Sequence, residues 1–323
     1  MHDDRASARC QVMLTGATGF IGRELSRSIS LAGHKVIEAC RRPGGPASAA
    51  HRIVLGDFGQ ATDWSAALRD VEVVIHCAGL AHVAREAPDP ELAYMRANVQ
   101  VTRCLAQQAV AAGVKRFIFI SSIGVNGNCS AGPFTESDAP DPRGPYARSK
   151  WLAECALWEL RQHSRMELVI IRPPLVYGPG APGNFATMQR WVGKGVPLPL
   201  GAVHNRRSLV GIDNLCDMII HCLDHPGAAD QVLLVSDGHD VSTTELLRRL
   251  GEAMGRPARL IPCPVSMLRP CALLLGQRAL AQRLLGSLQV DISHTCQLLD
   301  WAPPYSLDEG LKRCFGRGGK FSR

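Results

Sequence analysis

A glycine-rich segment near the start of the chain, Gly16-Ala17-Thr18-Gly19-Phe20-Ile21-Gly22, limits the folds open to this sequence. An apolar run over Gln11–Thr15 precedes it and an amphipathic run over Phe20–Ala32 follows, which predicts a strand, a turn and a helix. At such a junction one glycine permits the tight turn, the next lets the backbone approach a pyrophosphate, and the last lets helix and strand pack closely. The free N–H groups of the helix N-terminus then face the phosphates. We therefore expect a dinucleotide site whose cofactor-binding residues include Gly16, Thr18, Gly19, Phe20, Ile21 and Gly22.

Strand and helix patterns alternate through the first half of the chain. Further strands are expected at Lys35–Cys40, Arg52–Leu55, Val71–Cys77, Arg116–Ser121 and Glu167–Arg172, and helices at Trp64–Leu68, Glu91–Ala112 and Tyr146–His163. Strands that alternate with helices favour a parallel sheet with helices on both faces. The predicted fold class is therefore α/β, a Rossmann-type doubly wound parallel sheet.

The pattern changes after Tyr177, where Gly and Pro become frequent and helices then dominate. Helices are expected at Thr243–Met254, Ser266–Leu285 and Leu307–Cys314, whereas Gln231–Ser236 has the pattern of a buried strand that returns to the sheet. This change predicts a smaller, mostly helical C-terminal substrate lobe. We assign residues 1–176, with 212–240 returning to them, to a dinucleotide-binding Rossmann domain, and 177–211 and 241–323 to the substrate-binding lobe.

Composition argues against several other classes of protein. Lys and Arg give a net charge of +7 but are scattered, and aromatic residues make up only 5%, so no nucleic-acid partner is expected. The 12 cysteines form no CxxC pair, which predicts reduced thiols, a cytoplasmic location and no metal site. Met1–Cys10 lacks the apolar core of a secretory signal. Prolines and an arginine interrupt the apolar stretch Leu260–Leu275, so stable membrane insertion is not expected, and a peripheral membrane contact there has no further support in the sequence.

The glycine spacing is GxxGxxG, and further short motifs follow it in order. They are Gly56-Asp57-Phe58, His76-Cys77-Ala78-Gly79, Arg96-Ala97-Asn98-Val99, Ser121-Ser122, Tyr146-Ala147-Arg148-Ser149-Lys150 and Arg172-Pro173-Pro174-Leu175-Val176-Tyr177-Gly178. Together they resemble the extended short-chain dehydrogenase/reductase family, also called the NAD-dependent epimerase/dehydratase family, over nearly the whole chain. The resemblance implies that Asp57 contacts the adenine of the cofactor. It adds the following cofactor-binding residues to the expected set: Asp57, Phe58, Cys77, Ala78, Gly79, Asn98, Lys150 and Pro173.

The same resemblance implies a catalytic set of Ser122, Tyr146 and Lys150. Tyr146 and Lys150 are four residues apart, so both side chains leave the same helix face. A tyrosine with a pKa of about 10 exchanges protons poorly near neutrality, and a neighbouring ammonium moves that pKa toward the working pH. Lys150 is also expected to hold the nicotinamide ribose. Ser122 is expected to hydrogen-bond the substrate oxygen, with Ser121 as the competing serine.

Two departures from the family pattern limit the reactions and substrate contacts expected of this chain. Dehydratases of the family carry an Asp-Glu pair after the catalytic serine or threonine, whereas Ile123 and Gly124 follow Ser122 here, so dehydration is not expected. Asn126 stands where the family usually has a tyrosine, so contacts made by that tyrosine are not carried over to this chain.

The end of the second strand bears on the choice of cofactor. Family members that prefer NAD place an acid there, bonded to the adenosine ribose. Here Cys40 occupies that place and Arg41 and Arg42 follow it, while Glu38 lies mid-strand. Two guanidiniums suit a 2′-phosphate, so NADP(H) is favoured and NAD(H) stays possible. Alternatively, both arginines are solvated surface residues.

Three residues of the substrate lobe resemble contacts to a sugar nucleotide. They are Tyr177, Asn184 in Gly183-Asn184-Phe185 and Arg207 in Arg206-Arg207-Ser208-Leu209, and together with Ser122 they form the predicted substrate-binding set. Each has an alternative role. Tyr177 would pack beneath the turn, Asn184 would cap a helix N-terminus, and Arg207 would be a solvated surface residue.

Five short segments refine the resemblance within the family: Gly183–Phe185, Pro197–Gly201, Asn205–Leu209, Val235–Gly238 and Gly286–Asp291. Together they resemble those of bacterial C4 reductases of UDP-4-keto-6-deoxy-N-acetylhexosamines, which form UDP-N-acetylquinovosamine in polysaccharide biosynthesis. The chain also resembles proteins described as UDP-glucose 4-epimerases. Arg41 and Arg42 favour the reductase, and a UDP-hexose 4-epimerase is the alternative. A reductase of small or steroid-like ketones and a non-catalytic NADP-binding regulator are lesser alternatives. The resemblance also implies a homodimer through the helices Glu91–Ala112 and Tyr146–His163.

Overall fold

A computed structural model describes residues 9–43, 51–81 and 89–316 of the chain. Most of Met1–Cys10, where no secretory signal is expected, lies outside the described residues. Among the helices of the described segments, none is long and apolar enough to cross a membrane.

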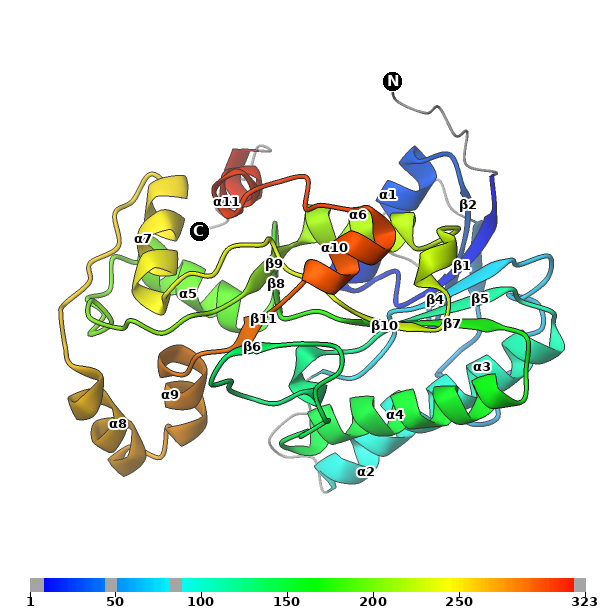
Figure 1. The fold of residues 1–323 in the computed structure, drawn as a ribbon, viewed down its shortest axis with the longest axis horizontal. Coiled ribbons are helices and arrows are strands. Elements are labelled where there is room, and N and C mark those ends of the chain that lie inside the picture. The colour runs from blue at the N-terminus through cyan, green and yellow to red at the C-terminus, as the bar shows by residue number, and fades with distance from the viewer. Residues whose placement is uncertain (1–8, 44–50, 82–88, 317–323) are drawn as a thin grey trace.

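The centre of the molecule is a parallel sheet (Figure 1). Within the described residues it has seven strands in the order β10-β7-β5-β4-β1-β2-β3. They are β1 (Gln11–Thr15), β2 (Lys35–Cys40), β3 (His51–Val54), β4 (Val73–His76), β5 (Arg116–Ile120), β7 (Glu167–Arg172) and β10 (Gln231–Leu234). The chain winds from β1 to one side and then to the other, so the predicted Rossmann-type, doubly wound α/β fold is confirmed. In such sheets, ligands bind at the carboxyl ends of the strands where the winding reverses, here between β1 and β4.

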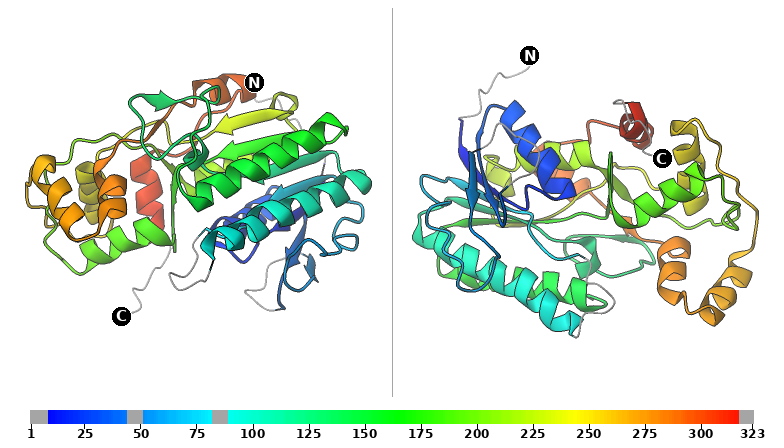
Figure 2. Two further views of the ribbon diagram at one scale, coloured as in Figure 1. Left: turned by 90° about the horizontal axis from the view of Figure 1, so that it is seen from below. Right: turned by 180° about the vertical axis from the view of Figure 1, so that it is seen from behind.

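Helices cover both faces of the sheet (Figures 1 and 2). α1 (Phe20–Leu31), α6 (Ile212–His221) and α10 (Ser293–Leu299) pack on one face, and α3 (Val101–Ala111) and α4 (Pro145–Gln162) on the other. Because strands covered on both faces have no solvent side, they are mostly apolar, as in the wholly buried β5, where the residues after Arg116 are all apolar. β10 comes from the late part of the chain and pairs with β7, as expected for the strand near Gln231.

The predicted long helix Glu91–Ala112 is present but not regular. It consists of α2 (Pro90–Tyr94), a π-helical segment η1 (Met95–Gln100) and α3. The π-helical segment contains Asn98, whose side chain is buried. Such segments interrupt the regular hydrogen-bond ladder and often mark functional sites.

The C-terminal lobe has its own apolar core. Its elements are β8 (Leu175–Tyr177), α5 (Gly183–Gly193), β9 (Leu209–Gly211), α7 (Thr243–Ala253), α8 (Val265–Leu274), α9 (Arg278–Leu285) and α11 (Leu307–Gly316). The short strands β6 (Pro133–Phe134) and β11 (Gln289–Val290) pair and join the lobe to the segment after β5. The short helices η2 (Ile123–Val125) and η3 (Pro226–Ala228) complete the fold. The domain boundaries assigned from the sequence stay a prediction.

Two helix predictions are wrong. Trp64–Leu68 forms turns, in which the Ala67 and Leu68 amides both donate to the Trp64 carbonyl and the Trp64 amide donates to Gln108 Oε1 instead of entering a helix. The predicted helix Ser266–Leu285 is divided into α8 and α9. It breaks at Gly276, whose φ of 66° is in the left-handed region that ends helices.

Candidate active site

Two glycines of the turn between β1 and α1 are required by close backbone approaches. Gly16 has φ 75°, and a Cβ added to it would lie 2.7 Å from the backbone nitrogen of Ala78. A Cβ added to Gly22 would lie 2.2 Å from the carbonyl oxygen of Gly16. No other residue fits these positions without moving the backbone, so the turn holds β1, α1 and the end of β4 close together.

A pocket of about 430 Å³ opens beside this turn at the carboxyl ends of β1, β2 and β4. Its lining includes most of the predicted cofactor-binding residues: Gly16, Thr18, Gly19, Arg41, Asp57, Phe58, Cys77, Ala78 and Gly79. A glycine cradle at a helix N-terminus, next to a half-buried aromatic ring, fits the pyrophosphate and adenine ends of a dinucleotide. The residues present therefore fit a nicotinamide dinucleotide.

Replacing Gly16 with alanine is expected to abolish cofactor binding. Alanine at φ 75° costs about 1–3 kcal/mol in strain alone, and its Cβ would push Ala78 into the pocket. Gly113→Ala is the matched control, because Gly113 has φ 76° and nothing lies within 4 Å of its added Cβ. Calorimetric titration with NAD⁺ and NADP⁺ should show binding to the control and none to Gly16→Ala. Equal affinities would mean that the cofactor does not lie against this turn.

The other predicted cofactor-binding residues surround the pocket without lining it. Phe20, Ile21 and Gly22 start α1, Arg42 is exposed beyond the end of β2, and Pro173 is buried after β7, where its carbonyl accepts a bond from Ile123 N at 3.0 Å. Asn98 and Lys150 contact Gly79, since a Cβ there would lie 3.1 Å from Asn98 Oδ1 and 3.3 Å from Lys150 Nζ.

Asn98 fixes the loop that leaves β4. Its Oδ1 accepts from Leu80 N at 2.7 Å, and its Nδ2 donates to the Leu80 carbonyl at 3.0 Å and to Ser149 Oγ at 2.9 Å. The side chain thus ties the loop that lines the pocket to α4. Asn98 therefore positions the loop around Gly79, which lines the pocket.

Sequence reasoning missed a buried histidine behind this loop. His76 Nδ1 lies 2.7 Å from Thr15 Oγ1, and its Nε2 lies 3.0 Å from Thr102 Oγ1. The Thr102 hydroxyl donates its proton to the Asn98 carbonyl at 2.6 Å, so the Thr102 oxygen must accept a hydrogen bond from His76 Nε2–H. His76 Nδ1 therefore carries no proton and accepts a hydrogen bond from the Thr15 hydroxyl. Burial and the Lys150 charge lower the pKa of His76 to about 3, so the ring is neutral. This chain of bonds joins β1, β4 and the π-helical segment, and only the fold brings its members together.

The three residues of the predicted catalytic set lie on neighbouring elements. Ser122 follows β5 and caps η2 through a bond from Gly124 N at 3.1 Å, while Tyr146 and Lys150 stand on the first two turns of α4. Lys150 is buried, donates to the Ile120 carbonyl at 2.9 Å and sits 4.6 Å from the centroid of the Phe119 ring. Ser122, Tyr146 and Lys150 are thus brought to the carboxyl edge of the sheet, beside the pocket.

The electrostatics of Tyr146 differ from the sequence expectation. Burial raises the pKa of Tyr146 to about 12, and a hydrogen bond with Ser122 offsets part of that rise. The Lys150 ammonium bonds to the Ile120 carbonyl and lies over the Phe119 ring. The phenol is therefore protonated at neutral pH and suited to donate a proton.

Lys150 gives a prediction on pH and stability. Burial lowers the pKa of Lys150 from 10.5 to about 8. Between these values the unfolded chain keeps a proton that the folded chain releases, so folding gains stability as the pH rises. From pH 8 to 10.5 the free energy of unfolding of the wild type should rise by up to about 3 kcal/mol relative to that of Lys150→Met. Below pH 8 the difference between the two proteins should not change with pH. Urea unfolding of both proteins over this pH range tests the claim, and a constant difference would contradict it.

The structure distinguishes the two adjacent serines. The buried Ser121 donates to the carboxylate of Glu154, whereas Ser122 is half-buried and bonded to Tyr146. Glu154 also accepts from Arg172 at 3.1 and 2.6 Å, and Arg172 donates to Asn126 Oδ1 at 3.0 Å. All of these partners are buried, so Ser121 and Asn126 belong to a structural network beneath the site.

The end of β2 presents no free carboxylate to the pocket. Glu38 is buried, where it accepts from Ser26 Oγ at 2.7 Å and pairs with Arg52 at 2.6 Å. Cys40 and Arg41 line the pocket, and Arg42 does not. The position that would hold an acid is therefore occupied by a thiol and followed by a cation.

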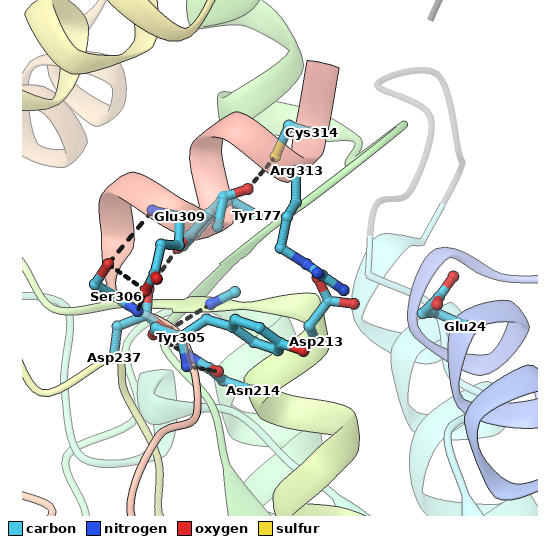
Figure 3. A network of polar contacts seen from close by, with 12 residues as sticks. Glu24, Tyr177, Asp213, Asn214, Asp237, Tyr305, Ser306, Glu309, Arg313 and Cys314 are labelled. Carbon is cyan, nitrogen blue, oxygen red and sulfur yellow. Dashed lines mark hydrogen bonds and ion pairs between the residues drawn. The ribbon is translucent and has the colours of Figure 1, made fainter. Parts of the chain in front are cut away.

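Tyr177 lies in the core of the C-terminal lobe (Figure 3). Its ring is fully buried, and its hydroxyl donates to Asp237 Oδ2 at 2.7 Å. The other oxygen of Asp237 accepts from Gly211 N at 2.8 Å and from Asn214 Nδ2 at 2.7 Å. Burial raises the pKa of Asp237. Of the two roles considered from the sequence, these contacts match packing beneath the turn.

Asn184 and Arg207 lie farther along the lobe. Asn184 is the second residue of α5, whose N-cap is Pro182, so the alternative role of Asn184 as the N-cap is wrong. Arg207 is half-buried, and its Nη1 donates to the Gly286 carbonyl at 3.0 Å, so it is not simply a solvated surface residue. Burial lowers the pKa of Arg207. Contact of either side chain with a substrate stays a prediction.

The sheet order, the glycine turn and the pocket define a Rossmann-type, dinucleotide-binding class of α/β protein. Residues 12–235 match the model of the NAD dependent epimerase/dehydratase family, and the chain belongs to this family. It is 45% identical over 307 residues to a UDP-glucose 4-epimerase of Vibrio cholerae, covering 94% of this chain and 93% of the relative. An N-acetyl-alpha-D-glucosaminyl-diphospho-ditrans,octacis-undecaprenol 4-epimerase of Escherichia coli O157:H7 is 27% identical, with 94% and 93% covered. The solved structure of MoeE5 with UDP-glucuronic acid and NAD is 25% identical and covers 93% of this chain and 96% of MoeE5, with a TM-score of 0.75.

Proposed function

We propose that the protein is a UDP-hexose 4-epimerase that works with a bound nicotinamide cofactor. The observation that carries this proposal is the 45% identity to a UDP-glucose 4-epimerase over nearly the whole of both chains. The site supports it through a phenol, a serine hydroxyl and a buried lysine beside a dinucleotide pocket, with no acid–base pair for water loss after Ser122. Alcohol–ketone interconversion without elimination is the chemistry that such a set supports.

A nicotinamide dinucleotide held at the glycine turn and beside Lys150 would supply the hydride acceptor, and then the hydride donor, for C4 of the sugar. Tyr146 Oη takes the proton of the 4-hydroxyl as C4 becomes a ketone, and supplies a proton to O4 as the inverted alcohol forms. Ser122 hydrogen-bonds O4 and fixes its distance from Tyr146. The first proton transfer needs Tyr146 as the phenolate, whereas the phenol is its resting form. Lys150, once released from the Ile120 carbonyl, would stabilise that phenolate and hold the ribose hydroxyls.

The identity of the cofactor belongs to the same proposal. The V. cholerae relative is a UDP-glucose 4-epimerase and the MoeE5 structure contains NAD, which supports NAD(H). The second candidate function is an NADPH-dependent C4 ketoreductase of a UDP-4-keto-6-deoxy-N-acetylhexosamine. Arg41 in the pocket lining and the absence of a free carboxylate at the end of β2 favour this candidate. We also propose a homodimer formed through the paired helices α3 and α4.

Replacing Arg41 with alanine tests the cofactor assignment. Because Arg41 lines the pocket and Arg42 does not, Arg41→Ala should weaken NADP⁺ binding by about tenfold or more and leave NAD⁺ binding nearly unchanged. Arg42→Ala is the matched control and should change neither affinity. Fluorescence titration of both cofactors with the three proteins measures this difference. Equal losses for the two cofactors would show that Arg41 does not face a 2′-phosphate.

Two parallel assays distinguish the candidate functions. The wild type is incubated with UDP-glucose or UDP-N-acetylglucosamine and NAD⁺, and the C4 epimers are measured by NMR. It is also mixed with UDP-4-keto-6-deoxy-N-acetylglucosamine and NADPH, and loss of the reduced-nicotinamide absorbance is followed. Epimer formation supports the main proposal, NADPH consumption alone supports the reductase, and inactivity in both assays overturns the proposed function.

A further inference from the structure

The hairpin of α8 and α9 lies at the outer end of the C-terminal lobe (Figures 1 and 2). It presents apolar side chains to solvent. Half of the strongly exposed large apolar residues in the described part of the chain fall between residues 261 and 275: Ile261, Met267, Leu273, Leu274 and Leu275. Leu274 is 87% exposed and Leu275 is 74% exposed. Clusters of this kind mark interaction surfaces, whereas single exposed apolar residues need no explanation.

The exposed face follows the helical repeat. Met267, Cys271 and Leu274 stand at i, i+4 and i+7 on α8 and are exposed, while Val265 and Leu268 point the other way and pack on the core of the lobe. Leu273 and Leu275 extend the exposed face to the turn at Gly276. α8 is therefore folded against the lobe with a second apolar face left open.

Charge in this part of the sequence is one-sided. From Gly255 to Val290 the sequence has five arginines, Arg256, Arg259, Arg269, Arg278 and Arg283, and no Asp or Glu, so five of the seven excess positive charges of the chain lie here. All five side chains are exposed. Within the described residues, none of them forms an ion pair.

We propose that the α8–α9 hairpin docks the protein on the surface of an anionic phospholipid bilayer. Exposed leucines flanked by arginines match the boundary between acyl chains and negatively charged headgroups. α8 spans only ten residues, so it lies in the interface and does not cross the bilayer. The one-sided charge favours a lipid surface over a second copy of this chain, because two copies would bring the hairpin's Arg269, Arg278 and Arg283 against the same three arginines.

Vesicle flotation tests the proposal with the full-length protein. The wild type should float with vesicles of phosphatidylglycerol and phosphatidylcholine. With vesicles of phosphatidylcholine alone it should remain unbound in the bottom fraction. The triple variant Leu273→Ser, Leu274→Ser, Leu275→Ser should lower the fraction bound by at least about tenfold. Leu31→Ser is the matched control, because Leu31 is 75% exposed on α1, far from the hairpin in the sequence, and should bind like the wild type.

A second variant tests the charge. Arg269→Gln, Arg278→Gln, Arg283→Gln should weaken binding by about fivefold for each arginine removed. Both triple variants change exposed side chains, so thermal unfolding should match that of the wild type. Failure of the wild type to float with anionic vesicles, or binding by the leucine variant equal to that of Leu31→Ser, overturns the proposal. Loss of self-association in the leucine variant, measured by sedimentation, would assign the face to a second copy of the chain and would also overturn it.

Discussion

Tyr146→Phe is expected to lower kcat by about 10²- to 10⁴-fold and to leave cofactor affinity unchanged. The phenol oxygen is the group that exchanges a proton with O4 in the proposed mechanism, and the substitution removes that oxygen alone. A pKa of about 12 means that Tyr146 is a proton donor at neutral pH, so its loss affects the step that forms the alcohol directly. Steady-state kinetics and a cofactor titration on the same preparation measure both quantities.

The matched control is Tyr94→Phe. The Tyr94 ring lies 6.0 Å from that of Tyr146, and its hydroxyl donates to the Ala81 carbonyl at 3.3 Å. Tyr94→Phe removes a phenol oxygen from the same neighbourhood without touching the predicted proton path, so it should keep most of the activity. If the two variants lose activity equally, Tyr146 acts through packing and is not the proton donor.

Arg172→Met is expected to lower the free energy of unfolding by about 3–5 kcal/mol. Arg172 and Glu154 are 4% and 0% exposed, and two bonds of 3.1 and 2.6 Å join them. Removing the guanidinium leaves a buried carboxylate with Ser121 as its remaining side-chain partner. The loss is large because of the charge left behind, and urea unfolding measures it.

The matched control for burial is Arg161→Met. Arg161 pairs with Asp230 through two bonds of 2.6 and 2.7 Å, but both side chains are about one-third exposed. Such pairs contribute at most about 1 kcal/mol, because water solvates either partner when the other is removed. A cost for Arg172→Met no greater than that for Arg161→Met would contradict the account of the network beneath Ser121.

The parts of the fold that local pattern specifies were predictable from the sequence. The glycine turn, the buried strands and the long helix through Asn98 all follow from spacing and apolar runs, and the structure has them. The helix predicted at Trp64–Leu68 is replaced by turns, in which the Trp64 amide bonds to Gln108, a residue distant in the sequence. The predicted helix Ser266–Leu285 runs through Gly276 because a single glycine is tolerated within a helical pattern, whereas its left-handed backbone ends α8.

Contacts between distant segments could not be predicted. The chain from Thr15 through His76 to Thr102 and the Asn98 carbonyl joins residues that only the parallel sheet brings together. Glu154 and Arg172 are likewise brought together only by the fold. Because Ser121 donates to Glu154, its hydroxyl belongs to this buried network, whereas Ser122 lies beside Tyr146. Motif matching identified the candidate site, but these partners determine which residues are available for chemistry.

The central claim is that C4 of a UDP-hexose is oxidised and reduced again within one site. Incubation with UDP-glucose deuterated at C4, followed by mass spectrometry and NMR of the product, tests it most directly. We expect the wild type to form UDP-galactose that keeps the deuterium at C4, and Tyr146→Phe to form it at least about 10²-fold more slowly. Galactose epimer without deuterium at C4, or no epimer at all, would contradict the account.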